Sequence, residues 1–332
     1  MKSYQTKSTN IQELEEGVLS GDRVILAKAI TLVESQLAAD QQLAEELIER
    51  LLPKTGNSIR LGITGVPGVG KSTFIETFGK HLTSQSKKIA VLAVDPSSHK
   101  TKGSILGDKT RMDELSKDPL AYIRPSATRG SLGGVTSGTS DAISLCEAAG
   151  FDVVIIETVG VGQSEIAVRE MTDFFLLLML AGAGDELQGI KKGIMEMADG
   201  IVITKADGEN IKHAVQAQQE YQHALHLFNS TESGWTPSVL TSSALTNKGI
   251  SEVWTMVQKY VELTSANGFF QEQRIQQDIF TLHSSIDEML RNFVTDKSKD
   301  LISSLEERVK LKQLSPRRAS RMVLENVIKL NK

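Results

Sequence analysis

Short apolar runs recur through the middle of the chain, between residues 59 and 241, and most of them are bounded by Gly, Asp or Pro. Within each run the apolar residues follow one another instead of alternating with polar ones, which is typical of strands covered on both faces, as in a parallel sheet. The segments between the runs are long enough to form helices. The pattern therefore predicts an α/β fold with a doubly wound, mainly parallel sheet. The expected strands are Ile59–Thr64, Ile89–Val94, Phe151–Ile156, Phe174–Leu180, Ile201–Thr204 and Ser238–Thr241.

Helical periodicity replaces this pattern towards both ends of the chain. Up to about Gly56 the apolar spacing predicts three helices, with Asp22 as an N-cap and Pro53 as the stop of the third. Near the other end, an amphipathic stripe over Ile275–Phe293 and a second stretch over Leu301–Leu311 predict further helices. The chain is expected to have an N-terminal helical extension, a central α/β domain and a C-terminal helical arm, at residues 1–57, 58–265 and 266–332.

Composition excludes several classes of protein. Among the 332 residues, 37 Lys and Arg stand against 41 Asp and Glu, a net charge of −4, so no global basic field favours nucleic acid. The longest apolar run, Phe174–Gly184, is too short for a membrane span, which needs about 20 residues. No secretory signal opens the chain, and the single Cys146 rules out an internal disulfide framework. We therefore expect a soluble cytoplasmic protein without a membrane or nucleic-acid partner.

The first expected strand runs into a complete G-x-x-x-x-G-K-S motif, and the helical run Thr73–Leu82 follows it. Glycines in this P-loop motif let successive backbone N–H groups point at phosphate oxygens, helped by the helix N-terminus. Lys71 is expected to reach the β- and γ-phosphates, and the Ser72 hydroxyl to bind Mg²⁺. The motif predicts a nucleoside triphosphate site. Its expected binding residues are Gly65, Val66, Pro67, Gly68, Val69, Gly70, Lys71, Ser72 and Thr73.

A magnesium site also needs carboxylates, and three stand in suitable places. Glu157 ends the strand-like run before Gly160, and it can hold a water bound to Mg²⁺. Gly160 is placed to give its N–H to the γ-phosphate, and Gln163 either positions the attacking water or is a structural switch residue. Asp95 follows another strand, and Asp108 lies in a polar loop. Both are candidates for contacts with Mg²⁺ or the water; the alternative is a solvated loop with helix caps.

The base is indicated by Thr204-Lys205-Ala206-Asp207, which is close to the N-K-x-D signature of guanine-binding proteins. A carboxylate at Asp207 accepts from guanine N1–H and N2–H₂ together, whereas the N1 lone pair of adenine would repel it. The Lys205 stem would lie along the base, and Thr204 stands where Asn is usual. Ser243-Ala244-Leu245 matches the segment whose backbone N–H contacts guanine O6. The order and the strand context favour GTP over ATP.

Taken together, the long motifs resemble the MeaB/ArgK family. These are P-loop GTPases that act as homodimeric G-protein chaperones of adenosylcobalamin-dependent acyl-CoA mutases, such as methylmalonyl-CoA mutase. The resemblance is carried by Gly65–Ser72, Asp95–Ser98, Gly103–Met112, Glu157–Glu165 and Ala183–Ile194.

The resemblance implies roles that spacing alone does not give. Asp95, Asp108 and Glu157 would surround Mg²⁺ and the catalytic water, with Asp108 on a first switch and residues 160–165 as a second. A third switch would contact the mutase through Asp185, Gln188 and Lys191. From the residues alone, this last segment would be interpreted as a polar helix N-terminus capped by Asp185.

Three functions are compatible with these residues. The expected one is a Mg²⁺-dependent hydrolase, converting GTP to GDP and phosphate, that gates cofactor loading of a mutase and protects it. The alternatives are a protein kinase or ATPase linked to amino-acid (LAO/AO) transport, and a GTP-sensing scaffold. Switch segments without an obvious acceptor site favour the hydrolase. The stripe Ile275–Phe293 is either core-facing or a dimer seam, and its place after the nucleotide domain favours a homodimer.

Overall fold

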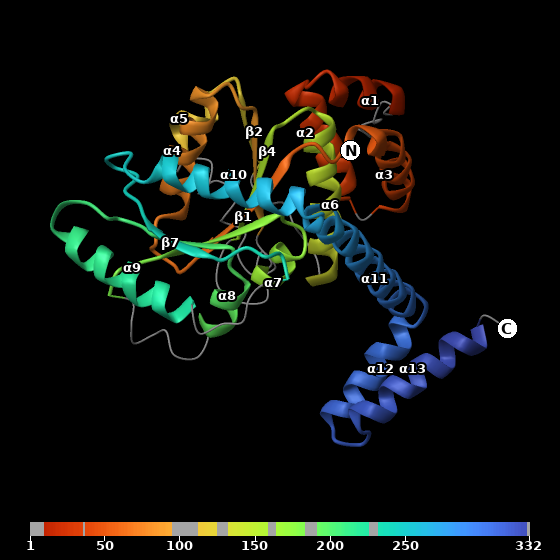
Figure 1. Cartoon of the computed structure of the whole chain (residues 1–332). Helices are drawn as coiled ribbons and strands as arrows, with labels where there is room; N and C mark the ends of the chain where they lie inside the picture. The colour runs from red at the N-terminus through yellow and green to blue at the C-terminus, as the bar shows by residue number, and fades with distance from the viewer. Residues whose placement is uncertain are drawn as a thin grey trace. The chain divides into compact units, whose positions relative to one another are not determined.

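The computed structural model describes residues 10–35, 37–94, 112–124, 132–158, 164–182, 191–225 and 232–330 (Figure 1). The chain divides into two units, Met1–Asp278 and Ile279–Lys332. The first unit carries the sheet and the predicted phosphate site.

A seven-stranded sheet forms the centre of the first unit, and all its paired neighbours are parallel. The strand order is β3-β2-β4-β1-β5-β6-β7, so the strand that leads into the phosphate motif is central. All six expected strands are present, with ends shifted by up to two residues, and the predicted fold class is confirmed. The strands are β1 (Ile59–Gly65), β2 (Ile89–Val94), β3 (Ala121–Arg124), β4 (Val153–Thr158), β5 (Phe174–Met179), β6 (Gly200–Ile203) and β7 (Ser238–Thr241).

The edge strand β3 is missing from the six strands that the sequence predicts. Its four residues, Ala-Tyr-Ile-Arg, do not form an apolar run, because β3 pairs only with β2 and needs no continuous cover on both faces. Tyr122 is held by tertiary packing against Phe151, with ring centroids 6.0 Å apart. Such a short edge strand is defined by its neighbours more than by its own sequence.

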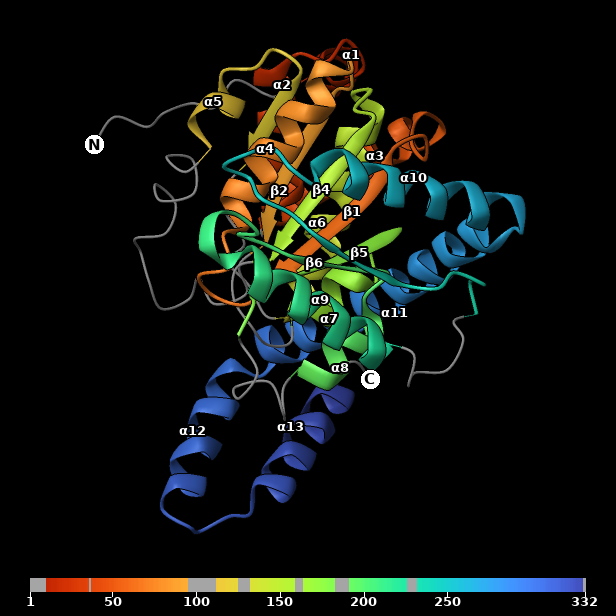
Figure 2. The ribbon, with the colours of Figure 1, turned by 60° about the vertical axis from the view of Figure 1, so that its left-hand side comes forward.

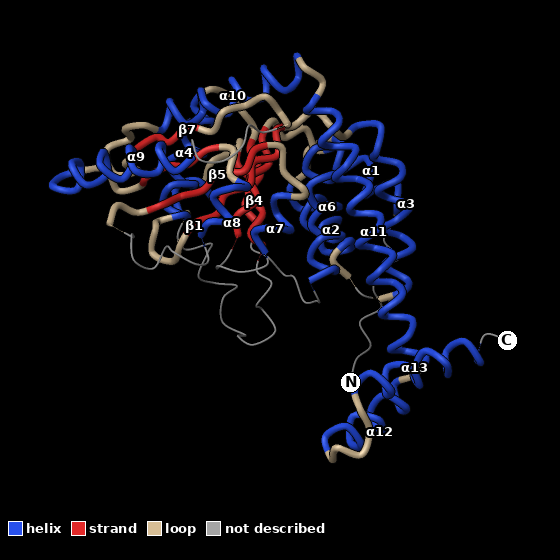
Figure 3. The backbone as a smooth tube through the Cα atoms, turned by 60° about the horizontal axis from the view of Figure 1, so that its bottom comes forward, coloured by secondary structure: helices blue, strands red, loops and turns tan. Residues whose placement is uncertain are grey.

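Helices cover both faces of the sheet, as the side view shows (Figure 3). The helices of the described residues, in both units, are α1 (Ile11–Leu19), α2 (Arg23–Val33), α3 (Ala38–Leu51), α4 (Lys71–Ser84), α5 (Asp113–Ser116), α6 (Leu132–Ala148), α7 (Ser164–Arg169), α8 (Lys191–Met197), α9 (Ile211–Leu225), α10 (Ile250–Ala266), α11 (Phe269–Lys297), α12 (Lys299–Lys310) and α13 (Pro316–Leu330).

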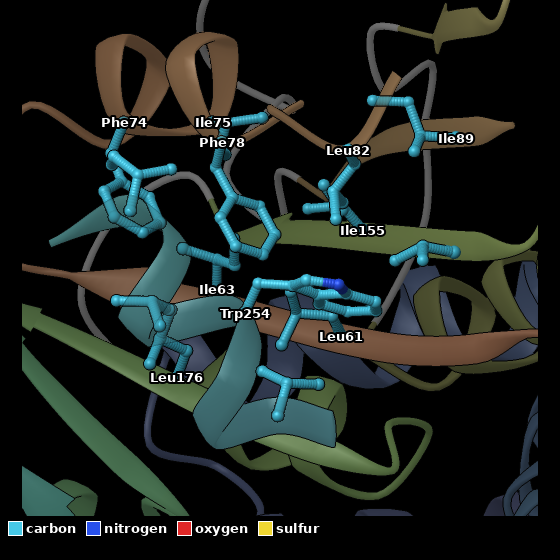
Figure 4. Packing of buried hydrophobic residues seen from close by; sticks show 14 of the residues in the cluster. Leu61, Ile63, Phe74, Ile75, Phe78, Leu82, Ile89, Ile155, Leu176 and Trp254 are labelled. Carbon is cyan, nitrogen blue, oxygen red and sulfur yellow. The ribbon is translucent and has the colours of Figure 1, made fainter. Parts of the chain in front are cut away.

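One face of the sheet is covered by α4, α5 and α10 (Figure 2). Alternate strand residues such as Leu61, Ile63 and Leu176 meet the aromatic side chains of these helices (Figure 4). Phe78 of α4 and Trp254 of α10 meet edge to face, with ring centroids 6.2 Å apart. This packing fixes α4, and with it the start of the helix at the phosphate motif, against the central strands.

The N-terminal helices belong to the cluster on the opposite face, where α6 lies between them and the sheet strands. Leu26 and Ile30 of α2 are fully buried in this cluster, together with Ile156 of β4. The expected cap is present, since the Asp22 carboxylate accepts the N–H groups of Val24 and Ile25 at 2.8 and 3.0 Å. The first three helices therefore share one core with the nucleotide domain.

Asp141 of α6 gives this helical layer a pH-dependent stability. Burial raises the pKa of its carboxyl to about 6, and the charge of Glu45 on α3 adds to the effect. Because the folded pKa exceeds the unfolded value, the folded state binds the proton more readily, and stability falls as the pH rises from about 4 to about 6. At about 1.4 kcal/mol per pKa unit, the loss is at most about 3 kcal/mol.

We expect Asp141→Asn to raise the free energy of unfolding at pH 8, where it removes a buried charge, and to leave it nearly unchanged at pH 4. Urea unfolding at the two pH values measures the difference. Glu49→Gln, at an exposed carboxylate of α3, is the matched control and should shift neither value. An Asp141→Asn effect that is equal at both pH values would contradict the assignment.

The second unit contains most of α11 and the antiparallel helix pair α12 and α13 (Figure 1). Leu305, Ala319 and Val327 are buried within it. The predicted stripe on α11 remains 40–62% exposed at Ile279, Leu282, Ile286, Met289, Leu290 and Phe293. No helix in the described part of the chain combines the length and apolarity that a membrane span requires.

Candidate functional site

The phosphate loop, Gly65–Ser72, begins where central strand β1 ends, between the ends of β4 and β5. The carboxyl ends of parallel strands are where open α/β sheets bind ligands. Gly65 is required there, because a Cβ on it would lie 2.5 Å from the carbonyl oxygen of Leu178 on β5. The neighbouring strand therefore passes too close for any side chain at this position.

Within the loop the backbone turns through two left-handed residues before α4 begins. Gly68 and Gly70 have φ values of +78° and +90°, which side chains disfavour. The Lys71 ammonium group donates to the carbonyl oxygen of Gly65 at 2.8 Å, so it folds back over the loop. Val69 is buried and anchors the loop in the core. The motif thus forms the curled loop and helix start that phosphate binding requires.

Beside the loop, the end of β4 supplies Glu157, which is only 4% exposed and stands in register with Ile63 of β1. The next residue, Thr158, bonds through its hydroxyl to the Thr64 hydroxyl at 2.8 Å, which ties the ends of the two strands together. Ser72 lies half-buried in the first turn of α4. Within the described residues, the groups here that could bind a metal ion are the Glu157 carboxylate and the Ser72 hydroxyl. Both are hard oxygen ligands, which suit Mg²⁺.

The predicted base-reading segment, Thr204–Asp207, follows β6 and bonds to the phosphate loop. The Thr204 hydroxyl donates to the carbonyl oxygen of Val69 at 2.7 Å, and the Lys205 ammonium donates to that of Gly68 at 2.8 Å. Lys205 itself has a φ of +57°. Two predicted halves of the site, 135 residues apart in sequence, therefore meet directly.

Asp207 faces a different partner, the loop after β7. Its carboxylate accepts the Ser243 hydroxyl at 2.5 Å, and the oxygen of that hydroxyl accepts the N–H of Thr246 at 3.2 Å. The Ser243 N–H donates to the carbonyl oxygen of Lys248 at 3.0 Å. These bonds orient the carboxylate that is predicted to read the base.

The loop after β7 is closed by Gly249, where a Cβ would lie 2.1 Å from the carbonyl oxygen of Thr241. It touches the phosphate-loop helix, since the Thr77 hydroxyl lies 3.4 Å from the carbonyl oxygen of Ala244. Leu245 is 81% exposed. The predicted Ser243-Ala244-Leu245 segment thus lies beside both Asp207 and α4.

Several predicted residues lie outside the described residues: Asp95, Asp108, Gly160, Gln163, Asp185 and Gln188. Lys191 begins α8, and its side chain is not among those that the structure describes. The structure adds two roles that the sequence reasoning missed, the tether from Thr204 to the phosphate loop and the support of Asp207 by the Ser243 hydroxyl. The only sequence signal for either was a hydroxyl residue within two positions of a strand end.

Comparison with known proteins bears on this arrangement. The profile of the family described as "Methylmalonyl Co-A mutase-associated GTPase MeaB" matches residues 26–299. A protein named probable GTPase from Mycobacterium tuberculosis is 50% identical over 317 residues, 95% of this chain and 94% of that protein. GTPase ArgK from Escherichia coli is 45% identical over 327 residues, 98% of each chain.

The solved structures agree with the sequence relatives. A crystal structure described as an LAO/AO transport system kinase superposes with a TM-score of 0.75 at 38% identity, covering 96% of this chain and 98% of that one. The chain therefore belongs to the MeaB family of methylmalonyl-CoA mutase-associated GTPases, and it is a GTP hydrolase.

Proposed function

We propose that this GTPase is a Mg²⁺-dependent G-protein chaperone for an adenosylcobalamin-dependent acyl-CoA mutase, which gates cofactor loading and protects the mutase. The observation that carries the proposal is the family match over residues 26–299, the greater part of the chain. It is supported by a base-reading segment that bonds directly to the phosphate loop. Such an arrangement suits a nucleotide switch.

In the proposed nucleotide site the phosphates bind the N–H groups of the phosphate loop and the N-terminus of α4. Lys71 turns from the Gly65 carbonyl to the β- and γ-phosphates. Ser72 and Glu157 hold Mg²⁺, which neutralises charge on the phosphate oxygens when bound. Asp207 accepts from guanine N1–H and N2–H₂. Since the Ser243 N–H already donates to Lys248, we assign the contact with guanine O6 to Ala244 or Leu245.

Water attacks the γ-phosphate in the proposed reaction, and we assign its orientation to the segments around Asp95, Asp108 and Gln163. Gly160 gives its N–H to the γ-phosphate and so distinguishes GTP from GDP. Each of these roles extends the family resemblance to residues of this chain. A preorganised set of donors around the transferring group is the main source of catalysis in phosphoryl transfer.

The mutase-contacting surface is proposed to include Asp185, Gln188 and Lys191, the last of which begins α8. We also propose a cytoplasmic homodimer in which the exposed α11 stripe of one copy covers that of the other. Seven-residue spacing of Ile279, Ile286 and Phe293 on one helix is the geometry of a helix–helix seam. Sedimentation of a Leu282→Asp, Ile286→Asp double variant tests the seam, and an unchanged dimer would exclude it.

GTP hydrolysis measured with and without an adenosylcobalamin-dependent acyl-CoA mutase tests the proposed function. We expect methylmalonyl-CoA mutase to raise kcat for GTP hydrolysis by about tenfold or more, because a partner that orders donors around the γ-phosphate lowers the barrier by about 1.4 kcal/mol for each factor of ten. A mutase that does not use cobalamin is the control. The alternative, a protein kinase linked to amino-acid transport, is favoured by the similarity to the crystal structure described as an LAO/AO transport system kinase. Transfer of γ-phosphate label to a protein, with no response to any mutase, would establish that alternative instead.

A further inference from the structure

The hydroxyl of Thr204 is committed to the phosphate loop. Thr204 is buried, at 5% exposure, and its hydroxyl lies 2.7 Å from the carbonyl oxygen of Val69 and 3.3 Å from that of Met179. The Met179 oxygen already accepts the Thr204 N–H at 2.9 Å. A hydroxyl carries a single hydrogen, so the shorter bond, to Val69, is the one it makes.

This bond fixes the orientation of one peptide of the loop. The described peptide bonds are trans and planar, so a carbonyl and the following N–H point in opposite directions. With the Val69 oxygen held towards Thr204, the N–H of Gly70 is turned the other way, towards the inside of the loop. Val69 is 1% exposed and Gly70 is left-handed, so the peptide has little freedom to rotate. The tether thus aims one of the donors on which phosphate binding depends.

Lys205 holds the preceding peptide in the same way, through the carbonyl oxygen of Gly68. The Lys205 carbonyl in turn accepts the Asn210 side-chain amide at 2.8 Å, which braces this part of the segment. Asp207 turns away from the loop, to the Ser243 hydroxyl. The base-reading segment is therefore divided: its first two residues bond to the phosphate loop, and its last two, Ala206 and Asp207, bond to Ser242 and Ser243 after β7.

We propose that Thr204 is a positioning residue for the phosphates of GTP and does not read the guanine base. The proposal rests on the nucleotide site proposed above. An Asn at this place would offer two amide hydrogens, enough for the loop and the base, whereas the one hydrogen of Thr204 is used by Val69. Guanine selectivity then depends on Asp207, and it is not weakened by the presence of Thr204 where Asn is usual.

Binding of three diphosphates to Thr204→Val separates the two roles. GDP is compared with 7-deazaguanosine diphosphate, which lacks N7, and with 6-thioguanosine diphosphate, in which sulfur, a weak acceptor, replaces O6 while N1–H and N2–H₂ are kept. N7 and O6 are the two acceptors on the major-groove edge of guanine. We expect Kd to rise about tenfold for all three nucleotides alike, since the buried Val69 carbonyl loses its donor. Thr204→Ser keeps the donor and should restore all three values to within about twofold of the native protein.

A loss with GDP that disappears with either analogue would overturn the proposal, because it would show that Thr204 contacts the base. Unchanged affinity for all three nucleotides would also overturn it. Thr204→Ala serves the same comparison should the Val variant fail to fold, as judged by circular dichroism. Lys71→Ala separates a failure of the Thr204 proposal from a failure of the proposed nucleotide site. If both Thr204→Val and Lys71→Ala leave GDP affinity unchanged, the nucleotide site itself is misassigned. Asp207→Asn is the opposite control, expected to change the ratio of GDP to inosine diphosphate affinity.

Discussion

Lys71→Ala is expected to lower kcat for GTP hydrolysis by at least about 100-fold. The ammonium group sits at the start of α4, bonded to the Gly65 carbonyl at 2.8 Å, and it is the one flexible cation of the phosphate loop. Removal of a preorganised donor to a transferring group typically costs a factor of about 100 to 1,000. Alanine keeps the helix, since it has the highest helix propensity. The loss should therefore come from the chemistry and not from the fold.

Steady-state phosphate release measures kcat, with GTP in each assay at a saturating concentration. Lys80→Ala is the matched control, because Lys80 lies on the same helix with its side chain about half exposed, 3.9 Å from Glu114. The control should retain kcat within about twofold, as expected for a surface ion pair. Hydrolysis by Lys71→Ala at the native rate would mean that the phosphate loop is not the catalytic site.

Arg274→Met is expected to lower the free energy of unfolding by about 3–5 kcal/mol, the cost of leaving a buried charge without its partner. Arg274 forms a fork with the Asp173 carboxylate, at 2.8 and 2.7 Å, and is only 7% exposed. Its other donors reach the carbonyl oxygens of Gly56 and Ser58, both at 2.6 Å, and its guanidinium lies 4.5 Å from the centre of the Phe270 ring. One side chain thus joins α11 to the starts of β1 and β5.

Urea unfolding of the first unit follows this change, with Arg291→Met as the control that removes an exposed arginine from the same helix. A planar fork is specific to arginine, so Arg274→Lys should recover only part of the stability. The double variant Arg274→Met, Asp173→Leu should be more stable than the sum of its parts, because no unpaired charge remains buried. A control and an Arg274→Met variant of equal stability would show that the fork contributes nothing.

The sequence predicted the sheet because its strands carry their own signal. Strands buried on both faces, such as Phe174–Met179, are apolar throughout, so each run is visible without knowledge of its neighbours. The edge strand Ala121–Arg124 has no such requirement and escaped the prediction. In the same way the left-handed glycines of the phosphate loop are a local need, and Gly68 and Gly70 stand in the motif that predicts it.

The sequence by itself therefore determined the fold class, the place of the phosphate loop and the carboxylate expected to select guanine. Only the tertiary structure decided which acceptor each hydrogen-bond donor meets. Thr204 and Val69 are 135 residues apart, and Arg274 and Asp173 are 101 apart. No local pattern fixes which carbonyl a hydroxyl meets across such a distance, because the hydrogen bond depends on how the strands and helices pack. The sequence names the residue types, and the packed core assigns their partners.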